Sequence, residues 1–242
     1  MPRAELRGLI QHFWSVRWDL RGLDPYQPGT LPHPNVHIVF DADGAQVSGV
    51  HTGRFTTKLE GQGWVFGAKF RPGAFRPFIP TSVATLRNRV IPLREILDAD
   101  ADPLTRAVMR ARSDQDKAKV IENFLLARQP TLDPVIDRVS RMVDEMAEDR
   151  AILQVEQLLN RWQISKRGLQ LLFNEYVGVG PKWVISRYRL HEALERLHLD
   201  EPINFTELAL ELGYFDQAHF IRDFRKLVGK TPAAYRRSHG SF

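Results

Sequence analysis

A face rich in hydrogen-bonding and cationic side chains lies near the carboxyl end, in residues 216–228. Four apolar residues recur there at helical spacing and predict a helix with one buried side: Phe220, Phe224, Leu227 and Val228. The opposite side carries Ala218, His219, Arg222, Arg225 and Lys226. Guanidinium and imidazole groups can bind the edges of bases in a major groove, and cations can bind phosphates. This pattern favours a helix that binds DNA.

A second helix and a tight turn must position that face. The preceding helix is indicated by Phe205, Leu208, Ala209 and Leu212, which recur at helical spacing. Gly213 ends this helix, and Asp216 is a good N-cap for the next one. After the second helix, Gly229 is suited to a C-cap, and Pro232 cannot continue the helix. Because Ala209 and Gly213 are small, the two helices can cross closely, as a helix-turn-helix requires.

Five ordered blocks of this stretch follow one known pattern: Ala209 and residues 212–214, 217–220, 224–226 and 229–236. These blocks resemble the AraC/XylS family of bacterial transcription regulators. The resemblance implies sequence-specific binding to double-stranded DNA, activation of transcription and RNA polymerase as a protein partner. It also implies two helix-turn-helix units joined by a long helix.

An internal repeat supplies the second unit. Leu169, Phe173, Gly178 and Pro181 match Phe220, Phe224, Gly229 and Pro232 at a constant offset of 51 residues. In the first copy we expect a positioning helix over 155–162, an N-cap at Ser165 and a recognition helix over 166–177. A connecting helix over 181–197 follows. Three residues depart from the family pattern, because Leu159, Gln163 and Leu171 replace a small residue, a glycine and an arginine.

Both recognition helices carry candidate DNA contacts. Arg222 is the best base reader, because a guanidinium pairs with guanine through two hydrogen bonds. The other candidates for base contacts are Gln217, Ala218, His219 and Ile221 in the second helix and Arg167, Gln170 and Asn174 in the first. The candidates for phosphate contacts are Lys166, Arg187, Arg225, Lys226, Arg236 and Arg237. The alternative for each cation is an ordinary solvated surface charge.

The front part of the chain has a β-rich pattern. Short apolar runs at 36–40, 46–50 and 64–70 are separated by turn residues and predict strands of a small barrel or sandwich. Residues 93–128 then follow a helical pattern. The fold class is therefore α+β, with a β-rich domain and trailing helices over 1–130 and an all-α, double helix-turn-helix domain over 131–242. The trailing helices either pack on the β domain or mediate a homodimer.

A looser resemblance covers roughly the first hundred residues. Residues 66–74 and 90–93 are similar to a sensor-like domain that precedes AraC-type DNA-binding domains. The resemblance implies an unidentified small-molecule effector, dimerisation or both. Candidate effector-binding residues are Trp64, Phe66, Phe70, Phe75 and Phe78, with an ordinary β core as the alternative. A regulator without this modulation, acting as a repressor or an architectural DNA-binding protein, is the alternative function.

Composition excludes several other classes of protein. The chain of 242 residues has no cysteine, so disulfides, thiolate zinc sites and cysteine nucleophiles are impossible. His33, His37 and His51 lack the close pair plus carboxylate of a barrel metal site, so we expect no metal and no cofactor. No catalytic motif points to an enzyme. Without a signal-peptide pattern or a membrane span, a cytoplasmic protein is expected.

The charge is distributed unevenly. The net charge is +5, and residues 150–242 hold 14 Lys and Arg against 10 Asp and Glu. The first 149 residues hold 20 against 19. The basic surplus therefore lies in the segment with the DNA-binding pattern, which suits a polyanionic partner.

Overall fold

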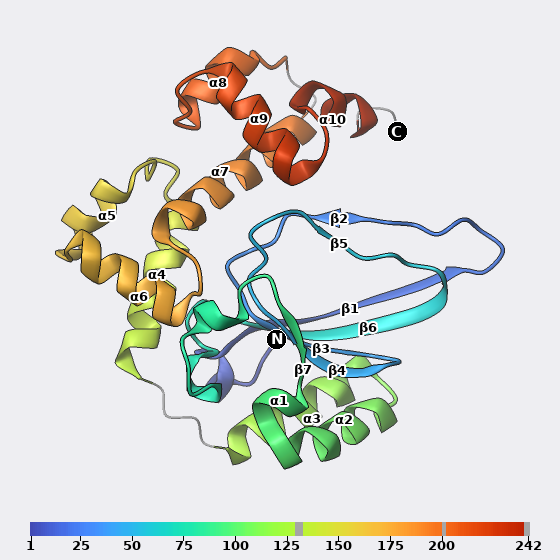
Figure 1. Cartoon of the computed structure of the whole chain (residues 1–242). Coiled ribbons are helices and arrows are strands. Elements are labelled where there is room, and N and C mark those ends of the chain that lie inside the picture. Colours follow the sequence, from blue (N-terminus) through green and yellow to red (C-terminus); the bar gives the residue numbers. More distant parts are fainter. Residues whose placement is uncertain (129–132, 200–201, 240–242) are drawn as a thin grey trace.

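A single open sheet forms the centre of the front part of the molecule (Figure 1). The computed structural model describes residues 1–128, 133–199 and 202–239. The five strands lie in the order β1-β6-β3-β4-β7, and every neighbouring pair is antiparallel. They span Ile10–Leu20 (β1), Gly61–Phe70 (β6), His37–Asp41 (β3), Gly44–Ser48 (β4) and Val90–Pro92 (β7). A separate two-stranded ribbon joins β2 (Gly29–Thr30) to β5 (Phe55–Thr56).

The predicted β-rich domain is confirmed, but it is not a closed barrel. In the described part of the chain, β1 and β7 form the two edges of the sheet and do not pair with each other. β7 is only three residues long and pairs with β4 alone, so it offers little backbone for closure. Helices that follow β7 bury one face of the sheet instead of a second layer of strands.

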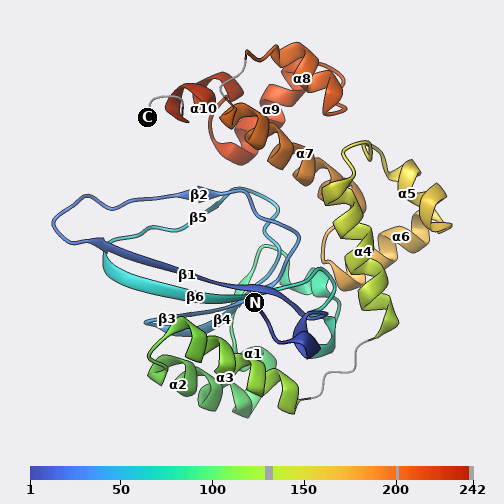
Figure 2. The same ribbon diagram turned by 180° about the vertical axis from the view of Figure 1, so that it is seen from behind.

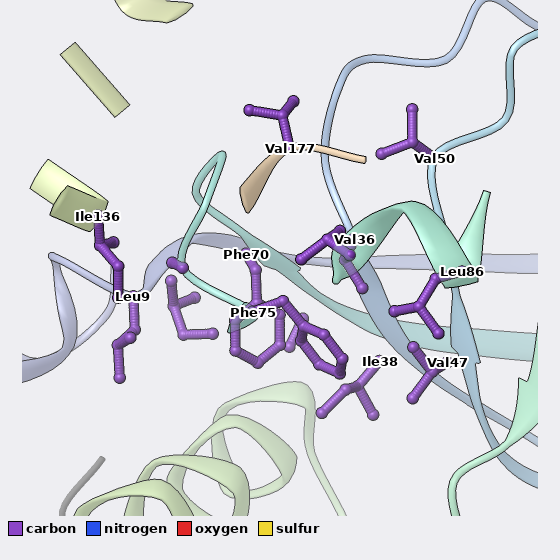
Figure 3. Packing of buried hydrophobic residues seen from close by; sticks show 14 of the residues in the cluster. Leu9, Val36, Ile38, Val47, Val50, Phe70, Phe75, Leu86, Ile136 and Val177 are labelled. Atoms are coloured by element: carbon purple, nitrogen blue, oxygen red, sulfur yellow. The ribbon is translucent and has the colours of Figure 1, made fainter. Parts of the chain in front are cut away.

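Those helices are α1 (Arg94–Leu97), α2 (Ala101–Arg110) and α3 (Asp114–Ala127). Figures 1 and 2 show them on one side of the sheet, with the β2–β5 ribbon on the other. Side chains alternate along a strand, so Phe66, Ala68 and Phe70 of β6 all turn to the helical side, and each is buried. Figure 3 shows Phe70 and Phe75 packed among Ile38 and Val47.

Short 3-10 helices occupy the connections of the front domain. They are η1 (Ala4–Leu6), η2 (Arg76–Phe78), η3 (Val83–Leu86) and η4 (Asp98–Asp100). η3 follows an N-cap at Ser82, whose hydroxyl accepts a hydrogen bond from the Ala84 amide at 3.2 Å. η3 lies against the helix over residues 166–176.

The rest of the chain is helical, as predicted. The helices are α4 (Pro134–Glu148), α5 (Val155–Trp162), α6 (Lys166–Tyr176), α7 (Pro181–His198), α8 (Phe205–Glu211), α9 (Gln217–Val228) and α10 (Pro232–His239). α4 opens with Asp133 as N-cap and proline in its first turn, as the sequence predicts. In Figure 1, α7 joins the group α4–α6 to the group α8–α10.

The buried apolar residues form two cores of unequal size. One core runs without interruption from the front domain through α4, α5 and α6 into the first turns of α7. The other gathers the far end of α7 with α8 and α9, and of the front domain's buried residues only Leu31 belongs to it. The predicted domain boundary between residues 130 and 131 lies outside the described residues. The larger core crosses it.

Candidate nucleic-acid interface

The internal repeat appears as two helix-turn-helix units, α5–α6 and α8–α9. The Ser165 hydroxyl accepts from the Gly168 amide at 3.1 Å, and the Asp216 carboxylate accepts from the His219 amide at 2.7 Å. Each second helix is followed by a left-handed glycine, and Gly178 and Gly229 share a φ of +87°. Prolines then begin α7 and α10. The repeat read from the sequence is therefore a repeat of backbone conformation.

The turn of the first unit forms despite its unusual residues. Gln163 adopts a left-handed conformation with φ +47°, where the second unit has Gly213 at φ +73°. The Gln163 side-chain amide donates to the Asn160 carbonyl at 2.6 Å. A non-glycine residue in this region costs about 1–2 kcal/mol. The first unit keeps the fold at a conformational cost that the second avoids.

The face of α6 opposite its buried side is accessible. Leu169 and Phe173 are fully buried, so the helix has the expected inner side. The residues predicted to contact DNA are exposed, namely Lys166, Arg167, Gln170 and Asn174. Leu171 lies among them and is 59% exposed. We call these five residues the α6 reading face.

α9 presents a similar face. Phe220 and Phe224 are fully buried, and the exposed residues are Ala218, His219, Arg222, Arg225 and Lys226. Gln217 and Ile221 are half-buried at its margin. We call these seven the α9 reading face.

Two side chains of the reading faces lie close to carboxylates of their own helix-turn-helix unit. Several of the exposed cations, in contrast, form no ion pair among the described residues. Lys166 Nζ lies 3.4 Å from Glu156, and His219 Nε2 lies 3.8 Å from Asp223. Four exposed cations form no ion pair within 4.0 Å among the described residues: Arg167, Arg222, Arg225 and Lys226. Exposed cations without a carboxylate partner suit an anionic surface.

Arg187 departs from its predicted role. It is 1% exposed, and its Nη2 donates to the Thr52 carbonyl of the front domain at 2.9 Å. The guanidinium also lies 4.5 Å from the Trp183 ring centroid, and burial lowers the pKa of Arg187 to about 10. A phosphate cannot reach this group in the described arrangement. Arg187 is a structural contact between α7 and the front domain.

The two cationic candidates of α10 lie beyond the second unit. Arg237 is exposed and Arg236 is half-buried. α10 lies against α7, where the Tyr235 hydroxyl and His198 Nε2 are 3.2 Å apart. The helix therefore holds its arginines beside the second unit and outside its reading face.

The front domain forms an ion pair and hydrogen bonds with the carboxyl end of α6 and the residues that follow it. Arg76 Nε lies 2.6 Å from Glu175, and Ser82 Oγ donates to the Asn174 carbonyl at 2.7 Å. Arg87 donates from Nε to the Gly178 carbonyl at 2.7 Å and from Nη2 to Asn174 Oδ1 at 3.3 Å. These contacts leave no local signal in the sequence, because they join residues about ninety positions apart.

A further contact joins the front domain to α7. The His33 and His191 rings stack with centroids 4.1 Å apart. Burial is the main cause that lowers the pKa of His33 to about 3 and that of His191 to about 4, so both rings are neutral near pH 7. A cavity of about 330 Å³ lies beside them, between α4 and α7.

The predicted effector residues do not surround one cavity. Phe70, Phe75 and Phe78 contact one another, with centroids 5.0–5.6 Å apart, and belong to the larger core or pack against it. The Trp64 ring lies 3.4 Å below Lys117 Nζ. Phe66 lines a cavity of about 560 Å³ between β1 and α3, together with Phe13. Phe70, Phe75 and Phe78 are therefore part of an ordinary hydrophobic core, which was the alternative to an effector pocket.

The three histidines weighed as metal ligands have other partners. His37 Nδ1 accepts from Trp14 Nε1 at 3.1 Å, His51 Nε2 lies 3.1 Å from Ser48 Oγ, and His33 stacks as described. Within residues 1–128, 133–199 and 202–239 no group of three His, Asp or Glu side chains could hold a metal ion. Over the same ranges, no helix has both the length and the apolar character to cross a bilayer.

Comparison with known families divides the chain in two. Residues 158–238 match the family described as a helix-turn-helix domain. Residues 1–92 match a family described as a domain of unknown function, DUF6597. The first match covers α6 to α9 together with most of α5 and α10, so it contains both reading faces.

Curated relatives are transcription regulators by name. The regulator ExsA of Pseudomonas aeruginosa is 28% identical over 128 residues, covering 49% of this chain and 46% of that protein. The F1 operon positive regulatory protein of Yersinia pestis is 31% identical over 101 residues, covering 42% and 33%. The regulator YtdP of Bacillus subtilis is 24% identical over 179 residues, covering 66% and 22%. The chain thus spans between about a fifth and a half of the length of these relatives.

Two solved structures are similar in part. A probable AraC family transcriptional regulator from Rhodopseudomonas palustris is 26% identical, with a TM-score of 0.39 over 43% of this chain and 97% of that one. ToxT from Vibrio cholerae is 11% identical, with a TM-score of 0.44 over 96% of this chain and 100% of that one.

Proposed function

Because this chain is an AraC/XylS-type regulator with an additional amino-terminal domain, we propose that α6 and α9 bind two successive major grooves on one face of double-stranded DNA. The observation that carries the proposal is the pair of reading faces. They lie at matching positions of a repeated unit, both are accessible, and both present side chains suited to base edges and phosphates.

The length of α7 supports this spacing. An α-helix rises 1.5 Å per residue, so the 18 residues of α7 extend over about 27 Å. Successive major grooves on one face of DNA are about 34 Å apart. The recognition helices flank α7 at its two ends (Figure 2), so a connector of this length suits grooves one turn apart.

The residues divide into two roles. Arg222 is the main base reader of α9, with His219 and Gln217 beside it, and Arg167, Gln170 and Asn174 read from α6. The phosphate contacts are Lys166, Arg225, Lys226, Arg236 and Arg237, which position the protein without reading sequence. Arg187 is not among them, because it is buried and donates to the Thr52 carbonyl of the front domain.

Selection of bound duplexes from a random pool tests the proposal on the whole chain. We expect enrichment of one sequence with two half-sites about one helical turn apart, and binding that weakens as salt is raised. A double variant, Arg167→Ala with Arg222→Ala, should no longer enrich the sequence that the wild-type chain selects. Arg106→Ala with Arg110→Ala is the matched control, because it removes two exposed cations from α2, on the sheet face covered by α1–α3. A folded wild-type chain that enriches no sequence would contradict the proposal.

The front domain is proposed to bind a small effector that alters this DNA binding. The cavity between β1 and α3 supports this part of the proposal, since it combines Phe13 and Phe66 with the polar groups of Asp114 and Glu122. A ligand that binds the native state raises its melting temperature. A thermal-shift screen with small metabolites, followed by operator affinity, provides the test. If no compound changes either quantity, an effector-independent regulator is the better description.

Protein partners belong to the same proposal. RNA polymerase follows from the resemblance to activators, and a second copy of the chain can pair through the α2–α3 helices of the front domain. Sedimentation of the free chain and of the operator complex measures whether one or two copies bind.

A further inference from the structure

One cation of the front domain lies at the edge of the α6 reading face. Arg87 follows η3 and is exposed. Its guanidinium donates to the Gly178 carbonyl and to Asn174 Oδ1, at 2.7 and 3.3 Å. Asn174 is the last residue of that reading face. Arg87 is therefore close to whatever Asn174 contacts.

Within the part of the chain that the structure describes, the positive charge of Arg87 has no carboxylate partner. Both acceptors of its guanidinium are neutral oxygens. No ion pair within 4.0 Å among the described residues includes it, whereas Arg76 of the same segment is paired with Glu175 at 2.6 Å. A guanidinium has five N–H donors, so two bonds leave others for a further acceptor.

The backbone around Arg87 is held against α6. Ser82 at the start of η3 donates to the Asn174 carbonyl at 2.7 Å. Gly178 is in the left-handed region, and a Cβ there would lie only 3.0 Å from the Val83 carbonyl oxygen. The absence of a side chain at Gly178 lets η3 approach closely. The guanidinium is thus fixed beside the reading face by contacts on both sides of it.

We propose that Arg87 is a DNA phosphate contact supplied by the front domain. This inference rests on the proposed function, because it applies only if α6 enters a major groove. The groove is about 12 Å wide and phosphates line both of its edges. With Asn174 in the groove, a cation 3.3 Å from its side chain lies in the same contact region. Arginine suits phosphate because its planar fork donates two parallel hydrogen bonds.

The test measures affinity against salt for the full chain on the selected operator and on a scrambled duplex. Each phosphate neutralised on duplex DNA contributes about 0.9 to the slope of log affinity against log salt. Arg87→Ala should therefore flatten the slope by about one unit and weaken both duplexes by the same factor. Arg87→Lys should keep the slope, because it keeps the charge and loses only the planar fork.

Arg110→Ala is the matched control. It also removes one exposed cation, but from α2, on the sheet face covered by α1–α3, so the slope should stay at the wild-type value. An unchanged slope in Arg87→Ala would overturn the inference. So would tighter binding, which would mean that Arg87 shields Asn174 from DNA. If Arg87→Lys flattens the slope as much as alanine, the residue acts through packing and the inference also fails. A wild-type chain that binds no duplex would instead refute the proposed function.

Discussion

The first helix-turn-helix unit packs into the same apolar core as the front domain, whereas the second unit has a separate core with the far end of α7. Hydrogen bonds and an ion pair reinforce the first arrangement, where Ser82, Arg76 and Arg87 hold the end of α6. Two copies of one motif can therefore differ in mechanical role. The first unit is tied to the domain proposed to bind an effector, and the second is attached mainly through α7.

The two reading faces also differ in their residues. At an offset of 51, Leu171 of α6 corresponds to Arg222 of α9, so the first face has an apolar side chain where the second has the cation proposed to read a base. The first turn also carries the strained Gln163 in place of Gly213. The second unit keeps the features suited to specific reading, while the first has exchanged some of them.

Truncation of the buried phenylalanines gives the largest expected effect and tests whether the cores are separate. Phe173→Ala and Phe224→Ala should each cost about 3–5 kcal/mol, since both rings are fully buried. All five tryptophans lie at positions 14 to 183, outside the second unit. In urea unfolding, Phe224→Ala should lower the midpoint of the helical circular dichroism signal and leave the fluorescence midpoint near wild type. Phe173→Ala should lower both midpoints.

An equal fall of both midpoints in Phe224→Ala would contradict the comparison. The chain would then unfold as one cooperative unit, and the two apolar clusters would have no separate thermodynamic meaning.

Removal of Arg222 should have the next largest effect. Arg222→Ala should cost about 1–3 kcal/mol on the selected operator and relax the preference at one base position. Arg236→Ala should weaken all duplexes equally and flatten the salt slope by about one unit. Binding to the operator and to a scrambled duplex over a salt series separates the two. If Arg222→Ala behaves like the Arg236 variant, Arg222 contacts phosphate and the orientation of α9 is wrong.

Leu171→Arg gives the α6 reading face an arginine at the position that corresponds to Arg222 in the α9 reading face. Leu171 is exposed, so the larger side chain needs no repacking. We expect the salt slope to steepen by about one unit, because one more cation reaches the DNA. Leu171→Ala controls for the lost leucine and should keep the wild-type slope. An unchanged slope in Leu171→Arg would mean that this part of α6 does not face DNA.

Exchange of the turn residues should give the smallest effects. Gly213→Ala should cost about 1 kcal/mol, because its φ is +73° and a Cβ would lie 3.3 Å from Arg189 and Leu153. Gln163→Gly should stabilise by about 0.5 kcal/mol, since relief of the left-handed strain exceeds the added freedom of the unfolded chain. Thermal unfolding measures both. Destabilisation by Gln163→Gly would show that its hydrogen bond to Asn160 outweighs the strain.

Local signals allowed much of the helical domain to be predicted. The N-caps Ser165 and Asp216, the buried Phe173 and Phe224, and the left-handed Gly229 each leave a mark within a few residues of sequence. These marks decide where helices begin, end and bury a face. They placed both reading faces on exposed surfaces without any tertiary information.

Contacts between distant segments could not be predicted in this way. Arg187 looks like any cation on an amphipathic helix, but it is buried and donates to the Thr52 carbonyl, 135 positions away. The aromatic residues of the front domain match a pocket as well as a core until their packing is known. Strand β1 was missed because polar residues interrupt its apolar positions, and its pairing with β6 spans some fifty residues.

The continuity of α7 has a consequence for the phase of the two half-sites. One residue inserted in the middle of an α-helix rotates everything beyond it by about 100° and shifts it by about 1.5 Å. The α9 face would then turn away from the side of DNA that α6 addresses. Four inserted residues would bring the rotation to within about 40° of a full turn and lengthen the separation by about 6 Å, slightly less than two base pairs. The number of residues in α7 thus encodes both the distance and the angular register between the sites the chain would accept.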